Sequence, residues 1–301
     1  MNTPASHRLR AVLSLLAGAV MISFAAVFVR TADLAATTSA FYRMLFGSAT
    51  LMLLLISQPS MRAGFGRHWP ASVLIGALFA ADLWFWHRSI LLIGPGLATL
   101  LANFQVFVLA LAGVLWMRER TGWRFAVGLA LAMIGLWLLF GRDWTGLNAT
   151  VRAGILYGLL TACAYGGYLL CLRGFQIRHQ RLSPEARLLQ VSLVTALLLA
   201  LLNGFEGHDF AIPDARSLLS LIALGVICQV LGWLAITRGM PGLPASLVGL
   251  LLLLQPTLSV LWDVLFFGLR LGPVQWIGAA LALAGIYFGL RASQRAVKQP
   301  G

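Results

Sequence analysis

The sequence predicts an all-α polytopic membrane protein with ten transmembrane helices, arranged as two inverted five-helix repeats. Composition is the first reason: 60% of the residues are hydrophobic and 10% are charged, whereas a soluble domain usually carries about 25% charged residues. Second, apolar windows of roughly 20 residues, enough to cross a bilayer, recur along most of the chain. Third, residues 97–140 are repeated at 247–290 without a gap.

The internal repeat is most specific at residues other than leucine, because leucine matches are common in an apolar chain. In a single register, Gln105 meets Gln255, Arg120 meets Arg270, Gly128 meets Gly278 and Gly135 meets Gly285. Self-similarity in one fixed register indicates a duplicated structural unit. We therefore divide the chain into a first repeat, residues 1–145, and a second repeat, residues 146–301.

Each repeat contains apolar segments separated by short loops in which Pro and Gly are frequent, as in the Gly94-Pro95 and Gly272-Pro273 turns. Five such segments are expected in each half. The predicted spans are 11–29, 35–57, 70–92, 96–117, 124–141, 153–173, 186–204, 217–237, 243–266 and 272–290.

Basic residues predict the orientation of these spans. An even number of spans places both termini on one side, and the loops on that side hold most of the Lys and Arg residues, which indicates cytoplasmic termini in the cell inner membrane. An odd number in each repeat gives the halves opposite orientations. The basic turn at 118–124 and its counterpart at 268–273, which retains only Arg270, agree with this. Inverted repeats are typical of secondary transporters, with the substrate site near the midplane.

Other function classes are less well supported. The net charge of +13 is explained by the basic loops, so the expected partners are the lipid bilayer and a small-molecule substrate, not nucleic acid. Cys163, Cys171 and Cys228 lack paired spacing, and no metal site or cofactor is expected. The chain has no phosphate-binding loop for ATP. It also lacks the clustered catalytic groups of an enzyme, so an integral membrane lipid enzyme is the weaker alternative.

Several residues together resemble a known family; they are Arg43, the turn containing Glu119, the repeated glycines, and the pair Gln255-Pro256. They resemble the EamA family of the drug/metabolite transporter superfamily, whose larger members have ten helices in two inverted repeats. Within it, the chain is most similar to the YddG-type aromatic amino-acid exporters. The halves divide the family pattern between them, because Val106 stands at the position of Pro256 and Leu269 at that of Glu119.

Ionisable residues inside spans usually face a cavity or a partner. Arg43, in the second predicted span, could bind a substrate carboxylate through two parallel hydrogen bonds or pair with Asp82. Asp82, in the third, could hold a substrate ammonium or take up a coupling proton. Phe79, Trp86 and Ser89 fall on the same helical face as Asp82. Trp86 suits an aromatic ring or an ammonium group.

The fourth and eighth spans supply further candidates. Thr99 and Asn103 share a face beside Phe107, and Asn103 could bind an amino-acid backbone or hold helices together. Gln229 and Trp233 are four residues apart and also share a face. Four polar residues of the third and fourth spans have no polar counterpart 150 residues later: Asp82, Ser89, Thr99 and Asn103. We therefore assign them to a substrate site and not to the repeat fold.

Two further ionisable residues are less clearly placed. His87 points more than a quarter-turn away from Asp82, so we expect it to be a rim or packing residue. Asp263, near the outer end of the ninth span, is an unrepeated polar group like Gln229, or is simply solvated.

These features predict a secondary transporter that exports small amphipathic metabolites, above all amino acids, by alternating access through a cavity between the repeats. A multidrug or other metabolite exporter of the same superfamily is the alternative. Phosphorylated sugars are disfavoured, since such anions need several buried basic residues and Arg43 is the only one well inside a predicted span. Both repeats lie in one chain, so a monomer is sufficient.

Overall fold

The computed structural model describes residues 4–62, 65–117, 123–141, 146–178, 183–239, 251–252 and 254–296, and every element within these residues is helical. In chain order the elements are α1 (Pro4–Ser23), α2 (Ala25–Thr31), α3 (Ala36–Ser57), η1 (Pro59–Arg62), α4 (Trp69–Ile93), α5 (Pro95–Ala102), α6 (Gln105–Met117), α7 (Trp123–Leu136), η2 (Trp137–Gly141), α8 (Ala149–Arg178), α9 (Pro184–Phe205), α10 (Ala215–Ala223), η3 (Leu224–Gly232), α11 (Trp233–Gly239), α13 (Leu254–Phe267) and α14 (Pro273–Ala296).

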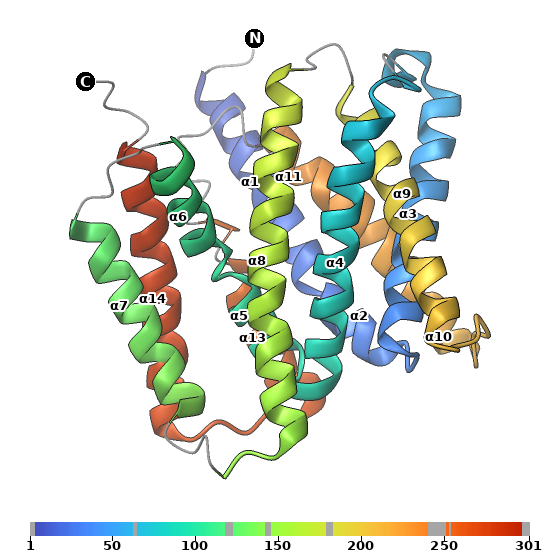
Figure 1. Ribbon diagram of the computed structural model, residues 1–301. Coiled ribbons are helices and arrows are strands. Elements are labelled where there is room, and N and C mark those ends of the chain that lie inside the picture. Colours follow the sequence, from blue (N-terminus) through green and yellow to red (C-terminus); the bar gives the residue numbers. More distant parts are fainter. Residues whose placement is uncertain are drawn as a thin grey trace.

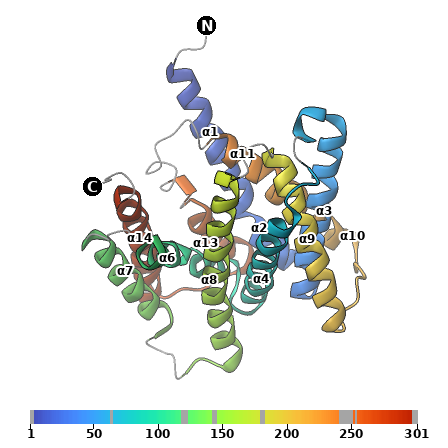
Figure 2. The ribbon, with the colours of Figure 1, turned by 45° about the horizontal axis from the view of Figure 1, so that its top comes forward.

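The helices pack as a bundle whose long axes run roughly in one direction (Figure 1). α1 begins and α14 finishes at the same end of the bundle, which we call the termini end. The opposite end, where α2, α4 and α13 finish and α8 begins, is the distal end. Seen from a second direction, α6, α7 and α14 group on one side and α3, α9 and α10 on the other, with α8 between them (Figure 2).

Length and composition make this a multi-pass membrane protein. The helices long and apolar enough to cross a bilayer are Leu9–Thr31, Ala36–Ser57, Trp69–Ile93, Ala149–Leu172, Pro184–Phe205 and Ala215–Ile236. Shorter apolar helices are Pro95–Leu109, Ala126–Leu139, Leu254–Phe267 and Pro273–Phe288. The basic turn at 118–122 and residues 243–250 of the predicted ninth span lie outside the described residues. The count of ten spans stays a prediction.

The predicted span 96–117 differs from the structure, in which a turn at Asn103 and Phe104 separates α5 from α6. The Asn103 side-chain Nδ2 donates to the Thr99 carbonyl oxygen at 2.8 Å, and the Phe104 N–H donates to the Leu101 carbonyl oxygen at 3.0 Å. An Asn side chain that bonds to the preceding turn competes with the regular helical pattern. The apolar character continues through the turn, so hydropathy alone did not reveal it.

Turn and capping residues fix other helix ends as their chemistry requires. Gly94 separates α4 from α5 with φ +90°, a left-handed conformation that favours glycine. Pro95 follows in the first turn of α5, where its missing N–H has no intrahelical partner to lose. At the start of α10, the Asp214 carboxylate accepts the Ser217 N–H at 2.7 Å.

The repeated glycines bring α7 and α14 into backbone contact. A Cβ atom added at Gly135 would lie 2.5 Å from the Ala282 nitrogen and 2.6 Å from the Gly278 carbonyl oxygen, and one at Gly285 would lie 2.5 Å from the Gly128 carbonyl oxygen. Residue numbers thus rise along α7 as they fall along α14, so the two helices are antiparallel. The two contacts are related by the repeat: Gly135 meets Gly278, and their repeat counterparts Gly285 and Gly128 meet each other. A two-fold axis produces this reciprocal pattern.

This packing predicts that Gly135→Ala destabilises the bundle. The added methyl group would meet the backbone of α14, which has no flexible side chain to move aside, so the two helices must separate. Overpacking of this kind costs about 1–3 kcal/mol. We expect a lower melting temperature for the purified protein in detergent, measured by fluorescence-detected size-exclusion chromatography.

Gly204→Ala is the matched control, because a Cβ atom there would meet nothing within 4 Å. It should melt at or above the wild-type temperature. Equal losses in both variants, or none in Gly135→Ala, would contradict the proposed close contact.

Candidate functional site

The candidate site begins with Arg43, whose side chain is buried in the middle of the bundle. Its Nε donates to the Oε1 of Gln229 at 2.9 Å, and its guanidinium carbon lies 5.5 Å from the centre of the Trp86 ring. These three residues come from α3, η3 and α4. Arg43 is thus positioned by a neutral amide and an aromatic face, neither of which neutralises its charge.

The π-helical segment η3 places Gln229 against α3. A π-helix is rare and often occurs at functional sites. It approaches α3 through small residues: a Cβ atom at Gly225 would lie 2.9 Å from the Gly47 nitrogen, and one at Gly47 would lie 3.0 Å from the Gln229 Cγ. The sequence predicted one span here but not its π-helical form. The glycines therefore allow η3 to reach the level of Arg43.

Asp82, on α4, is the second charged group and is only 6% exposed. It is close enough to Arg43 for the two charges to interact. Neither an ion pair within 4.0 Å nor a hydrogen bond joins them, although the structure describes both residues. The Asp82 carboxylate has no hydrogen-bond partner among the described residues, and Arg43 uses only its Nε there. Both groups retain the capacity to bind a further molecule.

An aromatic stack adjoins the two charges. The rings of Phe79 and Tyr168 lie 4.6 Å apart with 19° between their planes, and the rings of Tyr165 and Tyr168 lie 5.8 Å apart with 13° between theirs. Phe79, Tyr165, Tyr168 and Trp86 pack in one apolar cluster, and the Trp86 ring faces Arg43. Trp86 is half-buried. Two charges and four aromatic rings therefore share one region of the bundle.

Other predicted site residues bond to neighbouring helices. The Ser89 Oγ donates to the Gly154 carbonyl oxygen of α8 at 2.8 Å. The Thr99 hydroxyl lies 3.1 Å from the Ser259 Oγ of α13. Asn103 caps its own helix, as described above. The Ser89 and Thr99 contacts therefore join neighbouring helices, whereas the Asn103 side chain bonds within its own helix.

Two apolar candidates complete the predicted set. The Phe107 ring lies 5.7 Å from that of Phe104, at the turn between α5 and α6. Trp233 is half-buried and follows directly after η3. Gln229, which was predicted to share a helical face with Trp233, accepts the hydrogen bond from Arg43.

His87 is more deeply placed than the sequence indicated. It has no exposed surface, and its Nδ1 lies 2.8 Å from the Ser39 Oγ of α3. Its Nε2 is buried and has no hydrogen-bond partner among the residues described. The expected packing role agrees with this burial, but the expected rim position does not. Only the run of small hydroxyl residues at Thr37, Thr38 and Ser39 could have indicated that α3 accepts a polar partner here.

A polar cluster at the distal end joins α3, α4 and α9, and sequence reasoning missed it. The Glu206 carboxylate accepts from the Thr37 hydroxyl at 2.6 Å and from the Trp84 indole at 2.7 Å, and it pairs with Arg88 at 2.5 Å. The Arg88 guanidinium also lies 3.9 Å from the centre of the Trp84 ring. Glu206 is more than 100 residues from each of its three partners in sequence, so no local pattern connects it to them.

Electrostatics at Glu206 favours its ionised form. Partial burial acts to raise the pKa of this carboxyl, but the hydrogen bonds from Thr37 and Trp84 and the charge of Arg88 outweigh it. The pKa of Glu206 therefore lies below its ordinary value of 4.5.

Comparison with known proteins identifies the family. The model of the EamA-like transporter family matches residues 9–141 and, a second time, residues 152–291. The chain is 29% identical over 250 residues to "Uncharacterized transporter YwfM" of Bacillus subtilis (strain 168), covering 82% of this chain and 81% of that protein. It is 27% identical over 222 residues to the "Probable amino-acid metabolite efflux pump" of Salmonella typhimurium (strain LT2), covering 67% and 70%. These matches indicate a transporter and not an enzyme.

A solved crystal structure has the same fold. It aligns with a TM-score of 0.65 and 20% sequence identity, covering 96% of this chain and 99% of that one. At this identity the likeness concerns the fold alone.

The charge on Glu206 predicts how stability depends on pH. Because its pKa is lower in the folded protein than in the unfolded chain, its contribution is complete above pH 4.5 and is lost as pH falls through the folded value. Glu206→Gln should therefore melt below wild type at pH 7, and the difference should shrink as pH falls below 4.5. Thermal melts of both proteins across this range measure it.

Glu185→Gln removes a carboxylate at the opposite end of the same helix and serves as the control. A constant difference between wild type and Glu206→Gln at every pH would show that the Glu206 charge is not responsible.

Proposed function

We propose that this chain, which belongs to the EamA-like transporter family, exports amphipathic amino acids across the cell inner membrane by alternating access. The observation that carries the proposal is the pair Arg43 and Asp82, which are buried near each other without forming an ion pair. A free amino acid carries both complementary charges. Its carboxylate would bind the guanidinium of Arg43 and its ammonium the carboxylate of Asp82.

The two charges have different neighbours, which suits the two ends of a zwitterion. Arg43 donates Nε to Gln229 and keeps its two terminal nitrogens for a carboxylate, which two parallel hydrogen bonds can hold. Asp82 can accept from an ammonium group, and the Trp86 ring can add a cation–π contact to it. The Trp86 ring already faces Arg43. A bound amino acid would therefore add its own contacts to Arg43, Asp82 and Trp86, and no further polar residue would be needed.

The aromatic stack favours substrates with a large apolar side chain. Phe79, Tyr165 and Tyr168 offer ring faces beside the charged pair, and aromatic rings associate favourably beyond the burial of their area. We therefore propose aromatic amino acids as the preferred substrates, as in the YddG-type exporters that the sequence resembles. The printed name of the Salmonella relative, an amino-acid metabolite efflux pump, supports the wider class.

The proposed architecture is ten spans in two inverted repeats, 1–145 and 146–301. The two matches of the family model fall within these two parts. The antiparallel contact of α7 with α14 through repeat-related glycines supports opposite orientations of the halves. Gly-rich contacts allow helices to slide at close range, so the halves could rock around a fixed central site.

Polar contacts join the two proposed repeats toward the distal end. The Asp263 carboxylate accepts the Gly96 N–H at 2.9 Å, and the Trp262 indole donates to the Ser23 Oγ at 2.9 Å. With cytoplasmic termini, as the basic loops predict, the distal end faces outward. Release of substrate would then require these contacts to separate.

Counterflow in liposomes tests the site. Liposomes that contain the purified protein and unlabelled phenylalanine should accumulate labelled phenylalanine above empty liposomes. Loss of one charge-assisted hydrogen-bonding partner costs about 1.5–3 kcal/mol, so Arg43→Gln and Asp82→Asn should each raise KM roughly tenfold to a hundredfold. Repeating the assay with an imposed pH gradient shows whether transport is proton-coupled and whether Asp82→Asn removes the response.

Arg216→Gln and Asp209→Asn are matched controls, because both residues are exposed, Arg216 in the first turn of α10 and Asp209 between α9 and α10. They should keep the wild-type KM. Wild-type kinetics in both site variants would refute the site. Transport of drugs or other amphipathic metabolites, with no transport of any amino acid, would replace the substrate class with the alternative exporter.

A further inference from the structure

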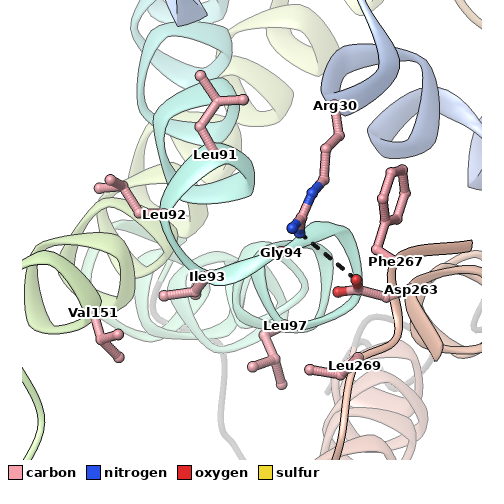
Figure 3. Close-up of a pocket in the computed structure, with 10 residues that line it drawn as sticks. All are labelled: Arg30, Leu91, Leu92, Ile93, Gly94, Leu97, Val151, Asp263, Phe267 and Leu269. Atoms are coloured by element: carbon pink, nitrogen blue, oxygen red, sulfur yellow. Dashed lines mark ion pairs between the residues drawn. The ribbon is translucent and has the colours of Figure 1, made fainter. Parts of the chain in front are cut away.

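A pocket opens at the distal end, where α2, α4, α5, α8 and α13 begin or finish (Figure 3). Its volume is about 310 Å³, which lies in the range of small-molecule sites. Most of its wall is apolar; the apolar side chains that matter here are Leu91, Leu92, Leu97, Val151, Phe267 and Leu269. The first three belong to the first proposed repeat and the last three to the second, so the pocket lies between the halves.

Two charged groups converge on this apolar wall. The Arg30 guanidinium lies 4.7 Å from the centre of the Phe267 ring and points toward Asp263 (Figure 3). Its Nη1 is 3.8 Å from the Asp263 Oδ1, too long for a hydrogen bond. The Arg30 side chain is 38% exposed, whereas that of Asp263 is 2% exposed. Arg30 therefore has donors available for an anionic group at the pocket mouth.

Asp263 is held in place by the turn before α5. Its Oδ2 accepts the Gly96 N–H at 2.9 Å, and a Cβ atom at Gly94 would lie 2.5 Å from the same oxygen. Only a glycine leaves room for the carboxylate here. The alternative that Asp263 is simply solvated is therefore wrong, because its side chain is buried beside partners in α2 and α5. Its Oδ1 remains directed at Arg30 across the 3.8 Å gap.

The pocket is separate from the Arg43 site in this structure. None of the described residues that line it contacts Arg43. Next to the pocket, α5 and α13 are in backbone contact: a Cβ atom at Gly96 would lie 2.6 Å from the Val260 Cα. The Ser259 Oγ also donates to the Pro95 carbonyl oxygen at 3.0 Å.

We propose that this pocket is a second binding site, an external vestibule for a zwitterionic amino acid with a large apolar side chain. The carboxylate binds Arg30, the ammonium binds the Oδ1 of Asp263, and the side chain contacts the leucines and Phe267. The assignment of the ligand as the exported molecule rests on the proposed function. The pocket lies between the proposed halves, beside the bond from Gly96 to Asp263 that release would have to break, so a released substrate would bind there on its way out.

Protection of a pocket cysteine tests the vestibule. Leu269→Cys, in nanodiscs that leave both faces accessible, is reacted with a methanethiosulfonate reagent, and labelling of its peptide is followed by mass spectrometry. Peptide-level detection separates this site from Cys163, Cys171 and Cys228. Phenylalanine at about ten times its Kd should slow labelling about tenfold by mass action. Arg30→Gln in the same background should abolish protection, and Arg216→Gln, at an exposed distal position, should preserve it.

Analogues test the charge requirement even if Arg30→Gln does not fold. Phenylpropionate lacks the ammonium group and phenethylamine lacks the carboxylate, so each should protect less than phenylalanine. Protection that survives Arg30→Gln, equal protection by either analogue, or none by phenylalanine would overturn the proposal.

Arg43→Gln separates the vestibule from the proposed transport site. Protection of Leu269→Cys should be unchanged in that variant while counterflow falls. If wild-type liposomes transport no amino acid yet phenylalanine still protects Leu269→Cys, the proposed function fails and the vestibule stands. If transport is normal but phenylalanine gives no protection, the vestibule alone fails.

Discussion

Two opposite charges, Arg43 and Asp82, are buried in the bundle without neutralising each other, and much of the structure is arranged around them. Placing either charge within a membrane costs about 2.5–3.5 kcal/mol on insertion scales, so such residues are kept only where they have a partner or a function. The partners here are incomplete: Gln229 supplies one neutral acceptor to Arg43, and Asp82 has no bonded partner in the described residues. A bound zwitterion would supply an oppositely charged partner to each of these two side chains.

Close packing around this pair depends on small residues at the contacts between helices. Gly47 and Gly225 bring η3 to α3 beside Arg43, and the reciprocal glycines of α7 and α14 hold the ends of the two proposed repeats together. Contacts without intervening side chains can shift with little loss of buried surface. The polar clusters centred on Glu206 and Asp263 at the distal end resist such shifts, because their hydrogen bonds form only in one arrangement of the helices.

Sequence reasoning predicted the features that local composition determines. Apolar windows located helices close to their observed bounds, and the repeated Gly128 and Gly135 indicated a structural role that the contact with α14 explains. The face formed by Phe79, Asp82 and Trp86 also lies at the centre of the candidate site. Contacts between distant segments were not predictable: the bond from Ser89 to α8, the burial of Asp263 and the Arg88–Glu206 pair each depend on residues far apart in sequence. The break at Asn103 was missed because apolar residues continue through it.

The most direct test of the central claim is a cryo-EM structure of the protein with bound phenylalanine. The account predicts density beside the aromatic stack, with the ligand carboxylate within hydrogen-bonding distance of the Arg43 guanidinium and its ammonium within that distance of the Asp82 carboxylate. A ligand bound elsewhere in the bundle, or a direct ion pair between Arg43 and Asp82 that excludes the ligand, would contradict it.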